Sequence, residues 1–458
     1  MTYEGEHMPG IDLLARLDKE YVWHPFTQMQ DWMKSEPLII QRGEGPYLID
    51  VEGKRYIDGV SSLWVIVHGH GKQEIIEAIE RQTRALCHST LLGLASVPPV
   101  LLARELVRIA PPGLSRVFYS DNGSTSVEIA LKMAYQYWQH RGERKRTRFL
   151  SFTNGYHGDT LGAVSVGGID LFHKVYRPLL FRSPKAPSPY CYRCPLHLEP
   201  ETCGMACVDA FEQQVKKYRD RLCAVIIEPA VQGAGGMLVQ PEGFLRAIWR
   251  ITREHGLLFI ADEVATGFGR TGEMFACLGA GISPDFLCVS KGITGGYLPL
   301  AATLTTEEVF KGFLGEFADF KTFFHGHTYT GNPVSCAAAI ASLQLFEKDR
   351  LLDRVAAASG LMKAGLQGFY ELSHVGDVRQ KGCMVGIELV ADRKKKRPYR
   401  PGEKVGQRVV LEARKRGVIV RPLGDVIVLM PPLATEDKVL EELLSVTYES
   451  IQAVTDDR

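Results

Sequence analysis

The sequence lacks the features that would place a protein in a membrane, outside the cell or on nucleic acid. No apolar run approaches the ~18 residues of a membrane-spanning helix, and the opening MTYEGEHMPGIDLLARLDKEY is too polar and acidic for a secretory leader. The formal net charge is only +1, so no general attraction to nucleic acid or anionic lipid is expected. These absences predict a cytoplasmic protein that binds neither nucleic acid nor a membrane.

Short apolar runs alternate with amphipathic stretches through the middle of this chain of 458 residues. Strands are expected at residues 116–119, 148–152, 224–227, 257–261 and 286–289, and helices at 126–140 and 243–254. Continuous apolar strands separated by helices are typical of a parallel sheet that is covered on both faces. The composition, with 45% hydrophobic and 23% charged residues, fits a globular protein with such a core.

The last part of the chain has a different pattern. A long helix is expected at 337–348, followed by strands at 384–389 and 418–421 with a helix between them. We therefore predict an α/β fold, in which a large domain with a mainly parallel sheet carries a smaller α+β domain. The expected parts are a segment at 1–75 that joins the small domain, the large domain at 76–335 and the small domain at 336–458.

Two neighbouring strands are expected to end in groups of opposite charge. The run LLFIAD ends at Asp262, and the run DFLCVSK ends at Lys291. Ligands of open α/β sheets bind at the carboxyl ends of the strands. A carboxylate and an amine at this edge suit pyridoxal phosphate, because the amine can bond to its aldehyde and the acid can keep its ring nitrogen protonated. For these two residues alone, a buried ion pair is an equally good interpretation.

Two further stretches carry weaker signals. A strand, the turn YSDNGSTS and a helix meet near Gly123, where the N–H groups of a helix start could bind a phosphate with help from Ser124 or Thr125. An ordinary helix cap is the alternative there. Tyr156 stands between glycines in NGYHGDT and could lie flat on a cofactor ring, although a surface turn has the same composition.

Together these segments closely resemble the class III, fold-type I aminotransferases that depend on pyridoxal phosphate, and the resemblance covers nearly the whole chain. It implies that Lys291 bonds to the cofactor and moves the substrate proton, that Asp262 pairs with the ring nitrogen and that Tyr156 covers the ring. These three are the expected catalytic residues, and burial would lower the pKa of the Lys291 amine and so suit it to both roles. The implied cofactor contacts are Gly123, Ser124, Tyr156, Asp262, Val264, Lys291 and, from the neighbouring subunit of a homodimer, Thr328.

Several segments resemble one branch of this class, which aminates 8-amino-7-oxononanoate in biotin biosynthesis by a ping-pong reaction. They are WHPFTQM, SSLWVIVHG, NGYHGDT, VQGAGGM and FHGHT. The implied substrate contacts are Phe26, Trp64, Tyr156, Arg270, Gly326 and Arg421. The planar fork of Arg421 suits a substrate carboxylate, whereas a surface salt bridge would be the simpler interpretation without the resemblance. The alternatives are another class III ω-aminotransferase, acting on 4-aminobutyrate or β-alanine with pyruvate or 2-oxoglutarate, and a non-catalytic protein that retains the fold.

Three departures from that branch leave the amino donor open. Members that use S-adenosylmethionine have tyrosine in place of Phe26, tryptophan in place of Leu63 and tyrosine in place of Val428. A related branch uses lysine, which has no adenine ring to stack on aromatic side chains. The donor is therefore expected to be either S-adenosylmethionine or lysine.

Four of the ten cysteines cluster in the segment CYRCPLHLEPETCGMAC. The spacing of Cys191, Cys194, Cys203 and Cys207 could bind zinc tetrahedrally. Disulfide or redox-linked pairs and free thiols are two further interpretations of equal weight, although a reducing cytoplasm favours zinc over disulfides. The family that the chain resembles needs no metal here, so any zinc would be structural and would hold an active-site loop in place.

Overall fold

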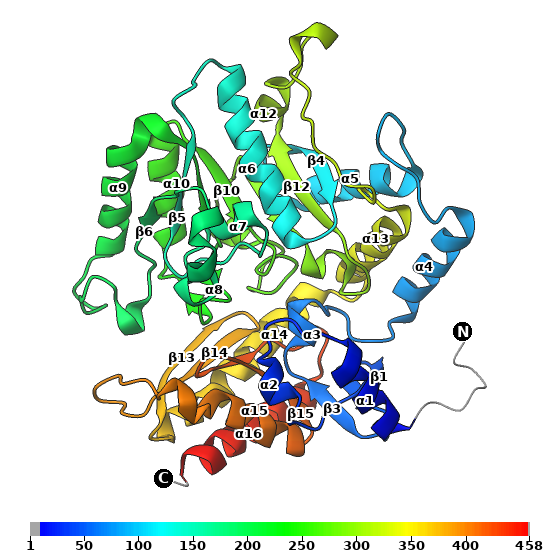
Figure 1. The fold of residues 1–458 in the computed structure, drawn as a ribbon, viewed down its shortest axis with the longest axis vertical. Coiled ribbons are helices and arrows are strands. Elements are labelled where there is room, and N and C mark those ends of the chain that lie inside the picture. The colour runs from blue at the N-terminus through cyan, green and yellow to red at the C-terminus, as the bar shows by residue number, and fades with distance from the viewer. Residues whose placement is uncertain (1–9, 457–458) are drawn as a thin grey trace.

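A seven-stranded sheet forms the centre of the upper part of the molecule in Figure 1. The computed structural model describes residues 10–456. The strands follow one another across the sheet as β4 (Leu114–Ser120), β12 (Ala301–Thr306), β11 (Phe286–Val289), β10 (Leu258–Asp262), β7 (Leu222–Ile227), β5 (Arg148–Phe152) and β6 (Lys185–Ala186). Neighbouring strands are parallel, except that β12 runs antiparallel to both β4 and β11.

Alternate residues of the central strands pack into two separate cores. Leu258 and Ile260 of β10 belong to the core that contains the apolar side of helix α6 (Gly123–His140). Phe259 belongs to the other core, with the buried side of α10 (Phe244–Glu254). Both faces of this strand are buried, which explains why its sequence is apolar without alternation.

Further helices surround this sheet. They are α4 (Gln73–Ala85), α5 (Val97–Ile109), α7 (Leu161–Val166), α8 (Asp170–His173), α9 (Ala206–Tyr218), α11 (Ala276–Gly279), α12 (Glu307–Lys311) and α13 (Pro333–Lys348). A short antiparallel hairpin is formed by β8 (Val231–Gln232) and β9 (Leu238–Val239).

The C-terminal part builds a four-stranded antiparallel sheet with helices against it. Its strands are β13 (Val375–Lys381), β14 (Met384–Leu389), β17 (Val426–Leu429) and β16 (Arg421–Leu423), in this spatial order. The helices are α14 (Leu351–Gly365), α15 (Val405–Lys415) and α16 (Asp437–Thr455).

The N-terminal strands complete a sheet with the C-terminal part. Strands β1 (Ile40–Glu44), β2 (Tyr47–Asp50) and β3 (Arg55–Asp58) are antiparallel, and β15 (Val418–Ile419) adds in parallel to β3. In this last pair Val418 lies opposite Ile57. The helices of this region are α1 (Ile11–Tyr21), α2 (Met29–Trp32) and α3 (Ser61–Trp64).

The predicted fold class is confirmed, and β5, β11 and β14 have the predicted bounds. The expected strand at 418–421 is instead two strands in different sheets, β15 and β16. Strand β12 was not among the predicted strands, and neither was its antiparallel direction. The division at residues 75 and 335 stays a prediction. Within residues 10–456, no helix is long and apolar enough to span a membrane.

Candidate active site

Lys291 lies where β11 gives way to a short 3-10 turn. Its φ of 45° is in the left-handed region, which residues with a side chain seldom adopt and which is often found at functional sites. Burial lowers the pKa of the Lys291 amine, while the charges of Asp262 and Glu228 oppose that shift. The environment therefore favours the neutral, nucleophilic amine more than water does.

Asp262 ends the adjacent strand β10 and is 4% exposed. Its Oδ2 lies 2.7 Å from Nδ1 of His157, and its Oδ1 accepts the N–H of Val264 at 3.1 Å. Both carboxylate oxygens therefore have hydrogen-bond partners in a buried place. Such bonds fix the orientation of a carboxylate.

A cavity of about 480 Å³ opens at these strand ends. Its walls include Trp64, Gly123, Ser124, Tyr156, Asp262, Val264 and Lys291. The structure thus brings together every predicted cofactor contact except Thr328. A Cβ atom on Gly123 would lie 2.5 Å from Cγ1 of Val264, so only glycine allows this close approach.

Helix α6 begins at the edge of this cavity. The side chains of Asn122 and Thr125 form a capping box across its first turn, so the hydroxyl of Thr125 is engaged in the cap. The oxygen of Ser124 accepts the N–H of Asp159 at 3.1 Å. A helix start also presents N–H groups without intrahelical acceptors and the positive end of the helix dipole. The cap and an anion site are therefore compatible at this position.

Trp64 is carried into the cavity wall by an unusual turn. Ser61, Ser62, Leu63 and Trp64 all have left-handed φ values, from 47° to 77°. Buried Asp58 holds the turn by accepting the N–H of Ser62 at 2.9 Å and its hydroxyl at 2.7 Å. Nε1 of Trp64 is buried without a hydrogen-bond partner, so it is a donor available to a ligand.

Tyr156 lines the same cavity. Its hydroxyl donates to Asp159 at 2.8 Å, and burial together with this contact raises the pKa of the phenol. The ring of Phe172 stands edge-on to Tyr156, with 6.4 Å between centroids, and to exposed Phe26, with 5.5 Å. Phe26 therefore adjoins the site through an aromatic row, and it is not itself part of the cavity wall described above.

Two residues of the site were missed in the sequence. His157 follows Tyr156 directly and forms a hydrogen bond with Asp262. The glycines around this pair led to a predicted role for Tyr156 alone. Glu228 follows the apolar run 224–227, and its carboxylate accepts the N–H of Tyr156 at 2.9 Å and of Gly233 at 3.0 Å. Burial and the charge of Asp262 raise the pKa of Glu228 to about 8. Asp262 and Lys291 were predicted because each is a charged residue at the end of an apolar strand. Glu228 has the same position after the run 224–227, so the same rule could have found it.

The two predicted substrate arginines differ in surroundings. Arg270 is 1% exposed and donates to the carbonyls of Pro431 and Ile66, both at 2.7 Å. It is not among the residues that line the cavity, and two of its nitrogens tie backbone segments together. Its Nε has no partner, so substrate contact by Arg270 stays a prediction. Arg421 is half-buried, its Nε has no partner, and burial lowers its pKa while nearby Tyr156 raises it. A carboxylate would satisfy this donor.

The predicted contacts in the loop near residue 325 do not line the cavity of the same chain. Gly326 and Thr328 are exposed. His327, between them, binds the cavity residue Asp121 with 2.7 Å between Nδ1 and Oδ2. The loop is therefore anchored beside the site, with Gly326 and Thr328 free to meet a neighbouring molecule.

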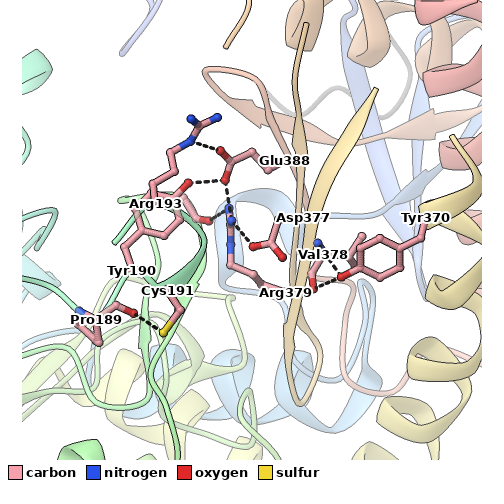
Figure 2. Close-up of polar contacts among 10 residues, drawn as sticks. Pro189, Tyr190, Cys191, Arg193, Tyr370, Asp377, Val378, Arg379 and Glu388 are labelled. Atoms are coloured by element: carbon pink, nitrogen blue, oxygen red, sulfur yellow. Dashed lines mark hydrogen bonds and ion pairs between the residues drawn. The ribbon is translucent and has the colours of Figure 1, made fainter. Parts of the chain in front are cut away.

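The cysteine segment lies against the C-terminal sheet (Figure 2). All four of its cysteines are free and partly buried, and burial raises the pKa of Cys191 and brings that of Cys207 to about 11. Among the residues that the structure describes, no three His, Cys, Asp or Glu side chains are grouped so that they could hold a metal ion. The zinc interpretation thus has no preassembled site. Elemental analysis of protein purified without chelators decides between metal and free thiols.

Comparison with known families matches nearly the whole chain to one family. The family model "Aminotransferase class-III" matches residues 29–451. The chain belongs to the class III aminotransferases. Members of this class depend on pyridoxal phosphate, which is therefore the cofactor, and the cavity suits it: an amine, a buried carboxylate and a helix start converge there.

Two relatives of this aminotransferase carry the same name. The adenosylmethionine-8-amino-7-oxononanoate aminotransferase of Nitratidesulfovibrio vulgaris is 58% identical over 97% of this chain and 82% of its own. The protein of that name from Geobacter sulfurreducens is 55% identical over 98% of this chain and 100% of its own.

Solved structures of other aminotransferases have the same fold as this chain. The crystal structure of the enzyme of that name from Methanocaldococcus jannaschii has a TM-score of 0.92 and 48% identity, covering 96% of this chain and 99% of that chain. An amine transaminase from an uncultivated Pseudomonas species, in a PLP-bound form, has a TM-score of 0.88 and 37% identity, covering 95% and 98%. The omega transaminase of Pseudomonas jessenii has a TM-score of 0.93 and 32% identity, covering 97% and 98%.

Proposed function

We propose that this aminotransferase converts 8-amino-7-oxononanoate to 7,8-diaminononanoate in biotin biosynthesis. The observation that carries the proposal is the 55% identity to the Geobacter sulfurreducens enzyme over that protein's full length. The cavity supports it, because its walls combine the apolar surface of Trp64 with a few polar groups, as an oxo acid with a long aliphatic chain requires.

The side chains of the cavity have distinct roles in this proposal. Bound pyridoxal phosphate supplies a reactive aldehyde and an electron-withdrawing ring. Lys291 would bond to it and then carry the proton that leaves the substrate carbon, because its amine is the base at the strand ends. Asp262, held by His157, would keep the ring nitrogen protonated. Gly123 and Ser124 would bind the phosphate, while Tyr156 and Val264 would enclose the ring.

Arg421 would fix the far end of each substrate in turn. Its unpartnered Nε and its place near Tyr156 suit a carboxylate at the mouth of the site. Trp64 would line the channel of the acceptor, and Phe26 would lie at its rim beyond Phe172. Donor and acceptor would use this one cavity alternately, as a ping-pong reaction requires.

The donor in this proposal is S-adenosylmethionine or lysine. Val428 is fully buried in an apolar cluster with Trp64, so the missing tyrosine there changes the packing behind the donor wall. Leu63 is 47% exposed on the turn that carries Trp64. Both positions are more apolar and smaller than in enzymes that stack adenine, which favours lysine on physical grounds.

The proposal includes a cytoplasmic homodimer with shared sites. Exposed apolar side chains beside the anchored loop, among them Phe320, Phe324 and Tyr329, would be covered by a second copy. Gly326 and Thr328 would then meet the cofactor or substrate of the partner. Sedimentation at micromolar concentration should give a dimer mass, and a monomer that still turns over would contradict shared sites.

Single half-reactions test both the donor and the acceptor. Protein loaded with pyridoxal phosphate is mixed with S-adenosylmethionine or with lysine, and loss of the absorbance of the lysine-linked cofactor is followed. The donor should bleach this band, and 8-amino-7-oxononanoate should restore it.

A broader ω-aminotransferase activity is the second candidate, because the Pseudomonas jessenii omega transaminase shares the fold with a TM-score of 0.93. In that case pyruvate or 2-oxoglutarate would restore the band after bleaching and the amino-oxo acid would not. This result would overturn the biotin assignment while leaving the class unchanged.

A further inference from the structure

A network of charged side chains joins the cysteine segment to the C-terminal sheet (Figure 2). The same network reaches the hairpin of β8 and β9 through the carbonyl of Gly236. Arg379 on β13 stands at its centre and is only 9% exposed at its side chain. One terminal nitrogen donates to Asp377 at 2.8 Å and to Glu388 at 2.6 Å. The other donates to the carbonyl of Gly236 at 2.8 Å. One guanidinium thus bridges two strands and a loop from another part of the chain.

Glu388 on β14 is the shared acceptor of this network. It is buried and accepts Nε of Arg193, in the cysteine segment, at 2.6 Å and the hydroxyl of Tyr190, which directly precedes that segment. Burial alone would raise its pKa, but the charge of Arg379 and these hydrogen bonds bring the pKa of Glu388 below its ordinary value. Glu388 is therefore ionised and paired with two arginines.

Stability alone does not account for such a network. Removing charges from water costs about as much free energy as their pairing returns, and apolar residues of the same volume often stabilise a protein as well or better. What buried ion pairs with fixed hydrogen bonds add is one defined geometry. The defined geometry here is the position of Gly236 relative to the C-terminal sheet.

Gly236 belongs to a tight turn that leads to the active site. The N–H of Gly236 donates to the carbonyl of Gly233 at 3.1 Å, and the N–H of Gly233 donates to Glu228 at 3.0 Å. The second oxygen of Glu228 holds the N–H of Tyr156 at 2.9 Å. A short chain of hydrogen bonds therefore runs from Arg379 to the backbone of a cavity wall.

Close packing leaves this turn little freedom to move independently of its neighbours. A Cβ atom on Gly386 of β14 would lie 2.8 Å from Cβ of Met237, and one on Gly233 would lie 3.2 Å from the ring of Trp64. The turn is therefore in contact with the sheet on one side and with Trp64 on the other. A shift of the turn would therefore move the cavity residue Trp64 and, through Glu228, the cavity residue Tyr156.

We propose that Arg379 is a positioning residue for transamination: by holding Gly236 it fixes the turn at 233–237 and, through Glu228, the placement of Tyr156 and Trp64. It does not touch the reacting atoms, so bonding of Lys291 to the cofactor should not depend on it. The geometry of substrate binding should depend on it, because a displacement of about 1 Å at a site can cost up to a hundredfold in rate. The inference rests on membership of the class and is independent of which donor is used.

Arg379→Met tests the proposal against Asp377→Asn. The first removes the bond to Gly236 and leaves Glu388 paired with Arg193 and Tyr190. The second weakens only the other arm of the same guanidinium. Both holoenzymes are compared with the wild type in half-reactions with S-adenosylmethionine and with lysine. Arg379→Met should raise the donor concentration at half-saturation about tenfold or more with the cofactor band intact, and Asp377→Asn should change it less than twofold.

Amide hydrogen exchange, followed by mass spectrometry on the cofactor-free proteins, gives a readout that needs no turnover. Arg379→Met should speed exchange in peptides that cover 228–239 and in those that cover Tyr156. Arg379→Lys can reach fewer of the three acceptors at once, so it should give smaller changes in the same direction. This variant replaces Arg379→Met in the test if the methionine variant does not fold. Unchanged exchange at Tyr156 together with unchanged half-saturation would overturn the proposal. That result would mean that Arg379 stabilises the fold without positioning the cavity residues. Loss of the cofactor band in a folded Arg379→Met protein would also overturn it.

Discussion

His157 and Asp262 form a buried pair in which Nδ1 of the imidazole lies 2.7 Å from Oδ2 of the carboxylate. His157 also lines the cavity, but Asp262 is the only hydrogen-bond partner of its imidazole among the described residues, so we expect its main contribution to pass through Asp262. A hydrogen bond to a charged group contributes about 1.5–3 kcal/mol, which corresponds to roughly 10- to 100-fold in rate.

We therefore expect His157→Phe to slow both half-reactions by about one to two orders of magnitude, with Lys291 still bonded to the cofactor. His157→Asn should recover part of the loss, since an amide can donate to the carboxylate. His173→Phe is the matched control, because His173 is buried with both ring nitrogens unpartnered and lies outside the cavity wall. Equal rates for His157→Phe and the wild type would show that Asp262 needs no imidazole.

Lys291→Ala should abolish covalent attachment of pyridoxal phosphate and reduce turnover by at least about a thousandfold, because both nucleophile and base are lost. Borohydride should trap cofactor on the wild type and on Lys394→Ala, which removes an exposed lysine, but not on Lys291→Ala. Intact mass spectrometry reads the attachment. Retained turnover by the alanine variant would refute the assigned base.

Leu63→Gly should stabilise the fold, because Leu63 has φ of 77° and a left-handed conformation costs a residue with a side chain about 1–2 kcal/mol. Leu63 is 47% exposed, so little burial is lost with its side chain. The expected gain in the free energy of unfolding is on the order of 1 kcal/mol. Leu314→Gly, at an exposed leucine whose φ is not positive, should destabilise; a fall in stability for both variants would contradict the strain argument. Denaturant titration measures both.

Lys185 should make stability depend on pH. Its amine donates to Ser151 at 2.7 Å and to the carbonyl of Ser165 at 3.1 Å, and burial lowers its pKa from 10.5 to about 7. Between these two values the unfolded chain binds a proton at Lys185 that the folded chain lacks. Its contribution to the free energy of unfolding therefore rises with pH from about 7 to 10.5.

Lys185→Met removes this contribution. Its melting temperature relative to wild type should be highest near pH 7 and should fall as the pH approaches 10. Lys311→Met, which replaces an exposed lysine, should follow the wild type throughout. A constant difference between Lys185→Met and the wild type across this range would mean that Lys185 keeps its ordinary protonation when folded.

Much of the large sheet, and several residues that line the cavity, could be predicted from local patterns in the sequence. Asp262 and Lys291 each end an apolar strand, and parallel strands bring their carboxyl ends to one edge. That rule required no knowledge of the rest of the chain. Gly123 was likewise marked by the turn before a helix.

Features that depend on distant contacts were not predictable in this way. The role of Glu228 follows from N–H groups of Tyr156 and Gly233, which only the folded chain brings to it. The resemblance implied a substrate contact for Arg270, whereas its hydrogen bonds reach Ile66 and Pro431, which lie 204 and 161 positions away in the sequence. The break between β15 and β16 depends on which sheet each strand joins, and strand composition does not encode that choice.

The turn that carries Trp64 depends on the far end of the chain. The hydroxyl of Ser61 donates to the carbonyl of Met430 at 2.6 Å, 369 positions later, and β3 completes its sheet only with β15. On the ribosome, the edge of β3 therefore stays unpaired until nearly all of the chain has been synthesised, and unpaired edges invite aggregation. Closing of the cavity is thus a late event in biogenesis, and nascent chains that stop short of Val418 should need chaperones to stay dispersed.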